Sequence, residues 1–509
     1  MRNYDVVYVY INSTVPQFRV RFRMTFEMLN QFFKKLFFHS TNVWSNWAGN
    51  QISKPEQIFK PKTLEDLQLI IANARRNSKH IRCYCSGHTW SSLSVTNGYL
   101  LDMTDMNKIS IEYNKEYECW TATVESGVSV EDLDNVLKQH NPSLAVSSNT
   151  VINSIRYGGI IATGCHGAGT NSHTIPDQMI KIEIVCADGE LYEFSDKINK
   201  LEMSAARVNL GVLGIIYRMT LKVEPMFRLR MTDTLLEVQQ VTSNSEYLKQ
   251  LVLNSDGVEI FYFPFNSCGL NSNNDKIWIK TWERTNDNLT ESGLPLNFKR
   301  LSQNLQTGFS EPLFETMVKH PSITPHLLYL LFQIIKEESN VLLAPDALHY
   351  QQGIDNILCL GMEFIFKVDE QFSNVWPKWN YVISKTYELA KKQPTPSYPF
   401  NLTMEMRFIK SSQALLSPAY DQNKDEIYCA IEIVSIKNSS GFNEFSNDVA
   451  LNWISNGSKA NPHWAKMWEH LNGIVPYIQQ THQQDNLLGQ FNSIRTKYDP
   501  NGLFFDNKS

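Results

Sequence analysis

The first half of the chain alternates between helical and strand-like patterns. Residues 63–74 (TLEDLQLIIANA) carry apolar side chains at helical spacing behind a capping threonine and early acids, which predicts a helix. Residues 81–85 read as a short strand. A second strand is predicted over residues 121–124. It is followed by a helix over residues 130–139, which again begins with acidic residues. These patterns predict two strand–helix units.

A glycine-rich segment, residues 157–169 (YGGIIATGCHGAG), follows these units. Further strands are predicted over residues 180–187, 191–194 and 213–223. Beyond Pro225 the strands become longer and less regular, so we place a domain boundary near residue 225. The pattern as a whole predicts an α+β protein with mixed sheets. Its expected parts are a lead-in (1–42), a first domain (43–225) and a second domain (226–509).

The lead-in contains a stretch, residues 18–38, that mixes arginine and lysine with phenylalanine and leucine. This composition fits a helix at a membrane interface, and equally a helix packed on the first domain. No apolar run reaches the roughly 18 to 20 residues that a spanning helix needs, since the longest is Leu327–Ile335. The amino terminus has no clean signal-peptide pattern. We therefore expect an intracellular protein, with peripheral membrane contact left open.

Charge and cysteine content exclude two classes of protein. The 509 residues include 47 Lys and Arg against 52 Asp and Glu, for a formal net charge of -5. Because binding to phosphates needs a concentrated basic surface, nucleic acid is not an expected partner. The eight cysteines are scattered without a CxxC pair, which favours free thiols over a disulfide framework.

Two glycine-containing segments, Ser86–Thr89 (SGHT) and Gly158–Gly169, offer the first candidate chemistry. Glycine lets the backbone approach a ligand closely, so N–H groups in these segments could hold a pyrophosphate. Neither segment has Rossmann or P-loop spacing, and tight turns without a ligand would explain the glycines equally well. His88 and His166 each stand beside a glycine, where a ring could reach a ligand. Neither has close partners in the sequence for a metal site, so no metal is predicted.

The second half of the chain contains a denser set of functional side chains. Residues 404–408 (MEMRF) read as a strand, which places Glu405 and Arg407 on one face. The two could form an ordinary salt bridge. Alternatively, the carboxylate could hold or deprotonate a hydroxyl while the guanidinium stabilises developing negative charge. Residues 462–466 (PHWAK) form either an anchor at a helix start or the wall of a site.

Together these segments resemble the sugar-1,4-lactone oxidase family, typified by L-gulonolactone oxidase and D-arabinonolactone oxidase, within the vanillyl-alcohol oxidase superfamily of flavoproteins. The resemblance covers roughly residues 43–506. Eight motifs in family order carry it: Asn46–Asn50 (NWAGN), Ser86–Thr89, Tyr157–Gly167, Ala205–Gly214 (AARVNLGVLG), Met404–Phe408, Leu415–Pro418 (LLSP), Pro462–Lys466 and Tyr498–Phe504 (YDPNGLF).

The resemblance implies how the chain binds its cofactor. Residues 43–225 would form an FAD-binding domain of the PCMH type, and residues 226–509 a substrate domain whose last segment returns to the first domain. His88 would bond covalently to the flavin. The other residues that the resemblance places at the FAD are Ser86, Gly87, Thr89, Trp90, Thr150, Gly158, Gly159, Thr163, Gly164, His166, Gly167, Gly214 and Ile215.

The resemblance also implies a reaction, the oxidation of an L-gulono-, L-galactono- or D-arabinono-1,4-lactone by hydride transfer to flavin N5. Glu405 would bind the substrate hydroxyls, Arg407 would balance negative charge on the reduced cofactor, and Lys466 would lie near both. O2 would be reduced to hydrogen peroxide, and the product would be ascorbate or an analogue. Three alternatives remain open: an alditol or other carbohydrate oxidase, a cytochrome-linked dehydrogenase, and a non-catalytic flavin-binding protein. Association with the endoplasmic reticulum or a mitochondrial membrane is likewise left open.

Two positions depart from the family pattern. Thr89 and Trp90 follow His88 where many members read GHS, a change that covalent attachment should survive. Thr150 stands where the family often has glycine in oxidases and alanine in an oxygen-blind dehydrogenase. Oxygen reactivity is therefore the property that this sequence leaves most open.

Overall fold

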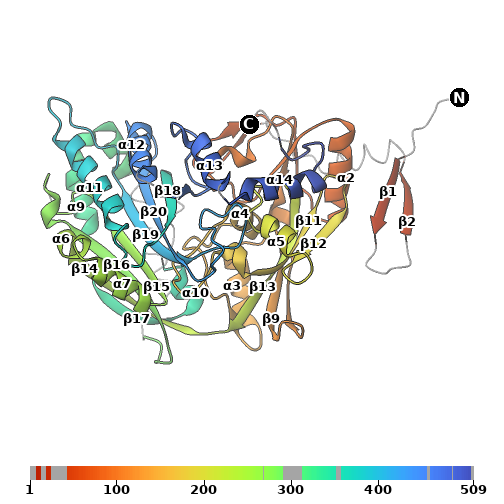
Figure 1. Ribbon diagram of the computed structural model, residues 1–509, viewed down its shortest axis with the longest axis horizontal. Helices are drawn as coiled ribbons and strands as arrows, with labels where there is room; N and C mark the ends of the chain where they lie inside the picture. Colours follow the sequence, from red (N-terminus) through yellow and green to blue (C-terminus); the bar gives the residue numbers. More distant parts are fainter. Residues whose placement is uncertain are drawn as a thin grey trace.

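The computed structural model of the chain describes residues 7–12, 19–24, 43–267, 269–290, 312–350, 357–455, 459–483 and 485–505. Figure 1 shows two lobes side by side, one drawn mainly in orange and yellow and the other in green to light blue. The dark blue helix α14 (Leu487–Tyr498) lies on the orange and yellow lobe, although it comes last in the sequence.

The first lobe contains three small or medium sheets. A parallel sheet has the order β5 (Gln57–Phe59), β7 (Tyr99–Asp102) and β6 (Ile81–Tyr84). An antiparallel sheet has the order β12 (Leu191–Ser195), β11 (Met179–Val185), β13 (Ile215–Pro225), β9 (Cys119–Glu125) and β8 (Ile109–Asn114), with β10 (Leu144–Ala145) paired to β13. The strands β3 (Trp44–Ser45) and β4 (Ile52–Ser53) pair with each other.

The helices of the first lobe begin where the sequence predicts them. Thr63 caps α2 (Leu64–Arg76) through a capping box with Asp66, and Ser129 caps α3 (Val130–Gln139) in the same way with Asp132. Both caps bond backbone N–H groups that the first turn of a helix leaves without partners. The two predicted helices and the α+β fold class are confirmed. Two shorter helices complete the lobe: α4 (Tyr157–Thr163) and α5 (Lys200–Arg207).

The second lobe is built on one antiparallel sheet. Its order is β17 (Glu338–Leu343), β14 (Arg228–Glu237), β16 (Lys276–Thr285), β15 (Gly257–Tyr262), β19 (Thr403–Lys410), β20 (Ile427–Ile436), β18 (Cys359–Lys367) and β21 (Asn461–Pro462). The helices of this part of the chain include α6 (Val238–Thr242), α7 (Ser245–Asn254), α9 (Thr324–Phe332), α10 (Ala344–Leu348), α11 (Trp376–Lys391), α12 (Phe442–Ile454) and α13 (Ile474–Gln483).

Alternation along the central strands gives this sheet two different faces. Phe364 of β18 is fully buried and packs edge-on against Trp453 of α12, so one face carries the apolar core. Glu363 and Glu432 belong to the opposite face, because successive side chains of a strand point to opposite sides. The charged residues of this second face form the candidate site described below.

The end of the chain returns to the first lobe. The backbone N–H of Ile81 donates to the carbonyl of Leu503 at 3.0 Å, and Arg82 donates to the carbonyl of Phe504 at 2.9 Å. Leu503 and Phe504 are buried in the same apolar cluster as the inner face of α2. A domain boundary near 225 stays a prediction; β13 ends at Pro225 and β14 begins at Arg228.

Two local expectations differ from the structure. Residues 19–24, expected within a helix over 18–38, form strand β2 (Arg19–Met24), antiparallel to β1 (Val7–Asn12). The helix prediction is wrong there, since RVRFRM alternates with period two; the rest of that stretch lies outside the described residues. Residues 157–163 form helix α4 where we expected a glycine turn. In the described part of the chain, no helix has the length and apolar content to cross a membrane.

Candidate active site

A cavity of about 1110 Å³ is lined by residues of both lobes. Its walls include nearly every residue that the sequence analysis assigned to the site. These are Ser86, Gly87, His88, Thr89, Trp90, Thr150, Gly158, Gly159, Thr163, His166, Gly167, Gly214, Ile215, Glu405, Arg407 and Lys466. Gly164 is the exception: it ends α4 in the left-handed conformation, with φ of 75°, and does not line the cavity. The fold thus brings together segments more than 300 residues apart.

The glycines at the start of α4 have two different roles. A Cβ on Gly158 would lie 2.8 Å from the Cβ of Ser126 and 2.9 Å from its carbonyl oxygen, so this glycine is required for packing. A Cβ on Gly159 would meet nothing within 4 Å. Because Gly159 also lines the cavity, it leaves bare backbone facing open space, as close approach of a ligand requires.

The ring of His88 is held by tryptophans. Trp47 stacks on it with ring centroids 4.6 Å apart and an interplanar angle of 16°. Trp90 lies edge-on to Trp47 at 5.9 Å, and its indole N–H donates to the carbonyl of Cys359 at 2.8 Å. This last bond connects the histidine segment to β18 of the second lobe. Trp47, which stacks on His88, is thus linked to the second lobe through Trp90.

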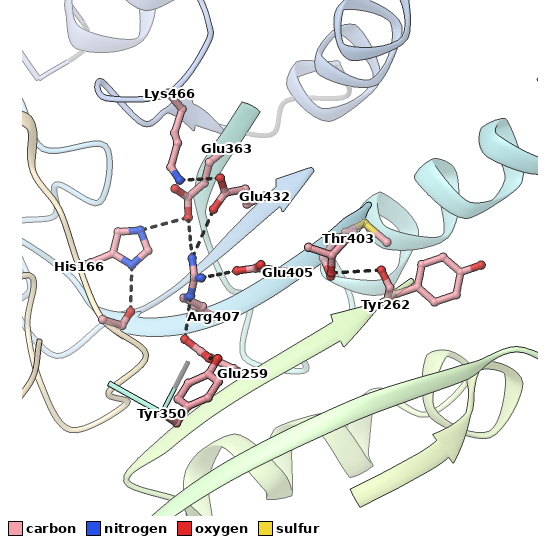
Figure 2. A network of polar contacts seen from close by, with 12 residues as sticks. His166, Glu259, Tyr262, Tyr350, Glu363, Thr403, Glu405, Arg407, Glu432 and Lys466 are labelled. Carbon is pink, nitrogen blue, oxygen red and sulfur yellow. Dashed lines mark hydrogen bonds and ion pairs between the residues drawn. The ribbon is translucent and has the colours of Figure 1, made fainter. Parts of the chain in front are cut away.

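Arg407 is surrounded by carboxylates from neighbouring strands (Figure 2). Its Nε donates to Glu259 Oε1 at 2.8 Å, and its Nη2 donates to Glu405. Its Nη1 lies 3.5 Å from Glu432 and 3.8 Å from Glu363. The pairing of the strands explains this arrangement: Glu259 lies opposite Arg407, Glu405 opposite Glu432, and Glu432 opposite Glu363.

Lys466 supplies the second cation of the cluster. Its Nζ bonds Glu432 Oε1 at 2.5 Å and lies 4.7 Å from the centre of the Trp90 ring. Lys466 comes from the loop that follows β21, which pairs with β18. The PHWAK segment is therefore a wall of the site, one of the two alternatives considered from the sequence.

Burial and neighbouring charges shift the pKa values of the acidic and basic groups in this cluster. Burial raises the pKa of Glu405 to about 7, with Arg407 opposing this shift and Glu432 and Glu259 adding to it. Burial also opposes charge on Arg407 and Lys466, yet the surrounding carboxylates outweigh it and raise both pKa values. The cluster thus contains two permanent cations and one carboxyl group that titrates near neutral pH.

A second polar group joins the two lobes beside this cluster. His166 Nδ1 donates to the carbonyl of Gly167 at 2.9 Å, and its Nε2 lies 3.2 Å from Glu363 Oε1. The ligand atoms of His166, Glu363 and His463 lie within 4.8 Å of one another, so His166 has close partners that the sequence did not show. The Ala465 N–H donates to His463 Nδ1, and burial lowers the pKa of His463 to about 3. His463 is therefore neutral, with its proton on Nε2. A metal ion could bind this ring only if Nε2 lost that proton, because Nδ1 already accepts a hydrogen bond.

Sequence reasoning missed Glu259, Glu363 and Glu432. Each is a single acid inside an otherwise apolar strand, as in GVEIFY, LGMEFIF and AIEIV. A charged residue at such a position is rarely buried unless it is paired, so the pattern itself was a usable signal. Tyr350 was also missed; its hydroxyl donates to Glu259 at 2.5 Å from a segment that carries no comparable pattern.

The residues present fit a bound FAD. The cavity is slightly larger than the usual range for ligand sites, and its lining is mainly apolar. The exposed backbone at Gly159, the fixed ring of His88 and the cations at the other wall match a long ligand with a pyrophosphate and a flat ring.

Comparison with known proteins agrees with this site. The FAD binding domain model matches residues 55–195, and the D-arabinono-1,4-lactone oxidase model matches residues 219–508, more than half of the chain. The L-gulono-1,4-lactone dehydrogenase of Mycobacterium tuberculosis is 25% identical over 464 residues, which are 91% of this chain and 97% of that protein. The L-gulonolactone oxidase of Scyliorhinus torazame is 24% identical over 478 residues, covering 91% and 96%.

The solved structures agree on the fold. Cholesterol oxidase from B. sterolicum superposes with a TM-score of 0.77 at 16% identity, over 92% of this chain and 95% of that one. At this identity the likeness establishes architecture alone, namely the vanillyl-alcohol oxidase type of fold that the sequence predicted. Together, the family models, the relatives and the cavity show that the chain belongs to the D-arabinono-1,4-lactone oxidase family of FAD-dependent aldonolactone oxidoreductases.

Proposed function

We propose that the protein oxidises a sugar-1,4-lactone at the hydroxyl-bearing carbon beside the lactone carbonyl, with O2 as the electron acceptor. The products are hydrogen peroxide and ascorbate or an analogue. The observation that carries this proposal is the position of Glu405, Arg407 and Lys466 on one wall of a cavity whose other wall has the features of an FAD site. L-gulono-, L-galactono- and D-arabinono-1,4-lactone are the candidate substrates.

FAD, when bound, supplies the two-electron acceptor for the hydride that leaves the substrate carbon. The residues that would hold it are the segment Ser86–Trp90, Thr150, and the start of α4 at Gly158 and Gly159. His88 is the proposed point of covalent attachment, because its ring is fixed and lines the cavity.

Glu405 is the proposed base for the substrate hydroxyl. A base works best when its pKa is near the operating pH, and that of Glu405 is about 7. Lys466 is less suited, because the carboxylate of Glu432 raises its pKa and keeps it protonated. The pKa values therefore support Glu405, and not Lys466, as the group that removes the proton.

Arg407 and Lys466 are proposed to stabilise negative charge. As the hydroxyl loses its proton, charge develops on the oxygens of the lactone, and fixed cations in a buried site stabilise that charge strongly. Both side chains are already held in place by carboxylates, so little reorganisation accompanies the reaction.

The alternative function is a dehydrogenase that passes electrons to a cytochrome. The observation in its favour is Thr150, which lines the cavity and whose hydroxyl donates to the carbonyl of Ile152 at 2.8 Å. A relative that covers nearly the whole chain is also named a dehydrogenase. Peroxide formed per lactone consumed, compared with the reduction of a dye or cytochrome, separates the two functions.

A substrate panel with one pair of variants tests the proposal. The purified protein should show a flavin spectrum that bleaches anaerobically with aldonolactones faster than with open-chain alditols. Glu405→Gln should slow this bleaching about 10²- to 10⁴-fold, while Glu112→Gln, on the exposed part of β8, should not. Equal rates with alditols would favour the carbohydrate-oxidase alternative, and an unaffected Glu405→Gln would remove Glu405 from the mechanism. The intracellular location stays a prediction.

A further inference from the structure

A row of charged residues crosses five strands of the large sheet. Glu338 lies opposite Asp233, Asp233 opposite Lys280, Lys280 opposite Glu259, and Glu259 opposite Arg407. Directly opposite residues share a face of the sheet, so the row ends at the proposed catalytic cluster. The proposed chemistry uses Arg407 and its neighbours, and leaves the other end of the row without a role.

Lys280 is an unusual residue in this row. It is only 2% exposed, yet it lines the cavity. Its Nζ bonds Asp233 Oδ1 at 2.5 Å and lies 4.9 Å from the centre of the Trp278 ring and 4.4 Å from that of Tyr350. Burial lowers the pKa of Lys280, and Asp233 opposes that shift. Burying an ammonium group costs a large desolvation energy. The ion pair of Lys280 and Asp233 on a cavity wall therefore points to contact with a ligand, and not to a role in stability alone.

The pair is rigidly held. The indole N–H of Trp278 donates to the same oxygen, Asp233 Oδ1, at 2.7 Å, and Phe261 stacks on Trp278 with centroids 4.7 Å apart. Tyr350 lies over Lys280 and donates to Glu259, which bonds Arg407. The pair and the catalytic arginine thus belong to one connected framework.

The distance between the two sites suits one substrate molecule. Lys280 and Arg407 stand on strands β16 and β19, with β15 between them. Two strand spacings amount to about 10 Å, and long side chains reach part of that way. A lactone ring held at Arg407 would therefore extend its side chain toward Lys280 and Asp233.

We propose that Asp233 and Lys280 form a subsite for the exocyclic hydroxyl groups of the lactone's side chain. This inference rests on the proposed function. A hydroxyl both donates and accepts, an ammonium has three donors, and a carboxylate has two acceptor oxygens, so the pair can bond each hydroxyl from both sides. Because the two charges cancel, the subsite suits a neutral polyol and not an anion such as a sugar phosphate.

The test compares lactones that share the configuration of their ring hydroxyls and differ in side-chain length. L-erythrono-1,4-lactone has no side-chain hydroxyl, D-lyxono-1,4-lactone has one, and L-gulono-1,4-lactone has two. The double variant Asp233→Asn, Lys280→Met removes both charges and leaves no buried charge unpaired. Anaerobic stopped-flow reduction of the holoenzyme gives the Kd and the limiting rate for each lactone. The control is Lys378→Met, a lysine whose Nζ lies 4.4 Å from the Phe366 ring outside the cavity.

In the double variant we expect the Kd for L-gulono-1,4-lactone to rise about 10- to 100-fold, while the Kd for L-erythrono-1,4-lactone and both limiting rates stay nearly unchanged. An equal rise for both lactones, or none for either, overturns the subsite. If the double variant does not fold, the wild-type protein alone decides, because its Kd should fall with each added hydroxyl and equal values contradict the proposal. Failure of the proposed function looks different, since no lactone would then reduce the wild-type flavin.

Discussion

Glu405 and Glu432 lie directly opposite each other on β19 and β20, and each bonds a different cation, Arg407 for the first and Lys466 for the second. Two carboxylates at such a position repel each other in a buried site unless cations or protons intervene. Glu432 bonds Lys466 and also lies 3.5 Å from Arg407 Nη1, whereas burial raises the pKa of Glu405 to about 7. The raised pKa of Glu405 is the property that suits this carboxyl group to proton exchange near neutral pH.

The first prediction concerns pH. In the proposed mechanism the ionised form of Glu405 is the base, so the limiting rate of anaerobic flavin reduction should rise with pH through an apparent pKa of about 7 and level off above it. In Glu405→Gln the remaining slow reduction should lose this rise. A variant that keeps the same profile would assign the titration to another group.

The second prediction concerns stability. Arg407→Met removes the cation that Glu259 and Glu405 share, and breaking a buried pair costs about 3–5 kcal/mol of the free energy of unfolding. Arg407 opposes the rise in the pKa of Glu405, so without this cation the folded-state pKa of Glu405 rises further. Groups with a raised folded pKa stabilise the fold below their unfolded pKa, and that contribution is lost as pH rises. The variant should therefore lose more stability at pH 8 than at pH 5, measured by urea unfolding.

A matched control for this variant is Arg284→Met. Arg284 forms a bidentate pair with Glu224 at the surface, where both side chains are partly exposed. The loss there should stay near or below about 1 kcal/mol and depend little on pH in the same range. Equal losses in the two variants would mean that the Arg407 cluster is no more than an ordinary ion pair.

The third prediction concerns the cofactor bond. His88→Ala should bind FAD that acid precipitation releases, whereas the wild-type protein should retain acid-stable flavin. Trp47→Leu removes the ring that stacks on His88, so we expect slower or incomplete attachment on adding FAD to apoprotein. Gel fluorescence after acid treatment measures both. Acid-stable flavin in His88→Ala would place the attachment elsewhere.

The fourth prediction concerns substrate charge. The wall of the cavity formed by the large sheet carries carboxylates in excess of cations. The five carboxylates from the second lobe are Asp233, Glu338, Glu363, Glu405 and Glu432, and the four cations are Lys280, Lys336, Arg407 and Lys466. A neutral lactone should therefore reduce the flavin, and the open-chain aldonate anion of the same sugar should bind at least about tenfold more weakly. Equal inhibition by aldonate and lactone analogues at neutral pH would contradict this.

Local signals in the sequence were sufficient for parts of the fold and site. The capping boxes at Thr63 and Ser129 are contiguous motifs, so both helices could be placed within two residues. Glu405 and Arg407 share one strand, and their common face follows from alternation alone. By contrast, Glu259, Glu363 and Glu432 reach the site only through strand pairing in the order β15-β19-β20-β18, which the sequence does not specify. In strand β2 the alternation of RVRFRM with period two outweighs the mixed basic and apolar composition that is typical of an interfacial helix.

Anaerobic titration of the purified protein with L-gulono-1,4-lactone and D-arabinono-1,4-lactone tests the central claim most directly. We expect the oxidised flavin absorbance to bleach with one of these lactones in the wild-type protein and far more slowly in Glu405→Gln. Admission of air should restore the oxidised spectrum and release one hydrogen peroxide for each lactone oxidised. A flavin that no aldonolactone reduces, although dithionite does, would contradict the account.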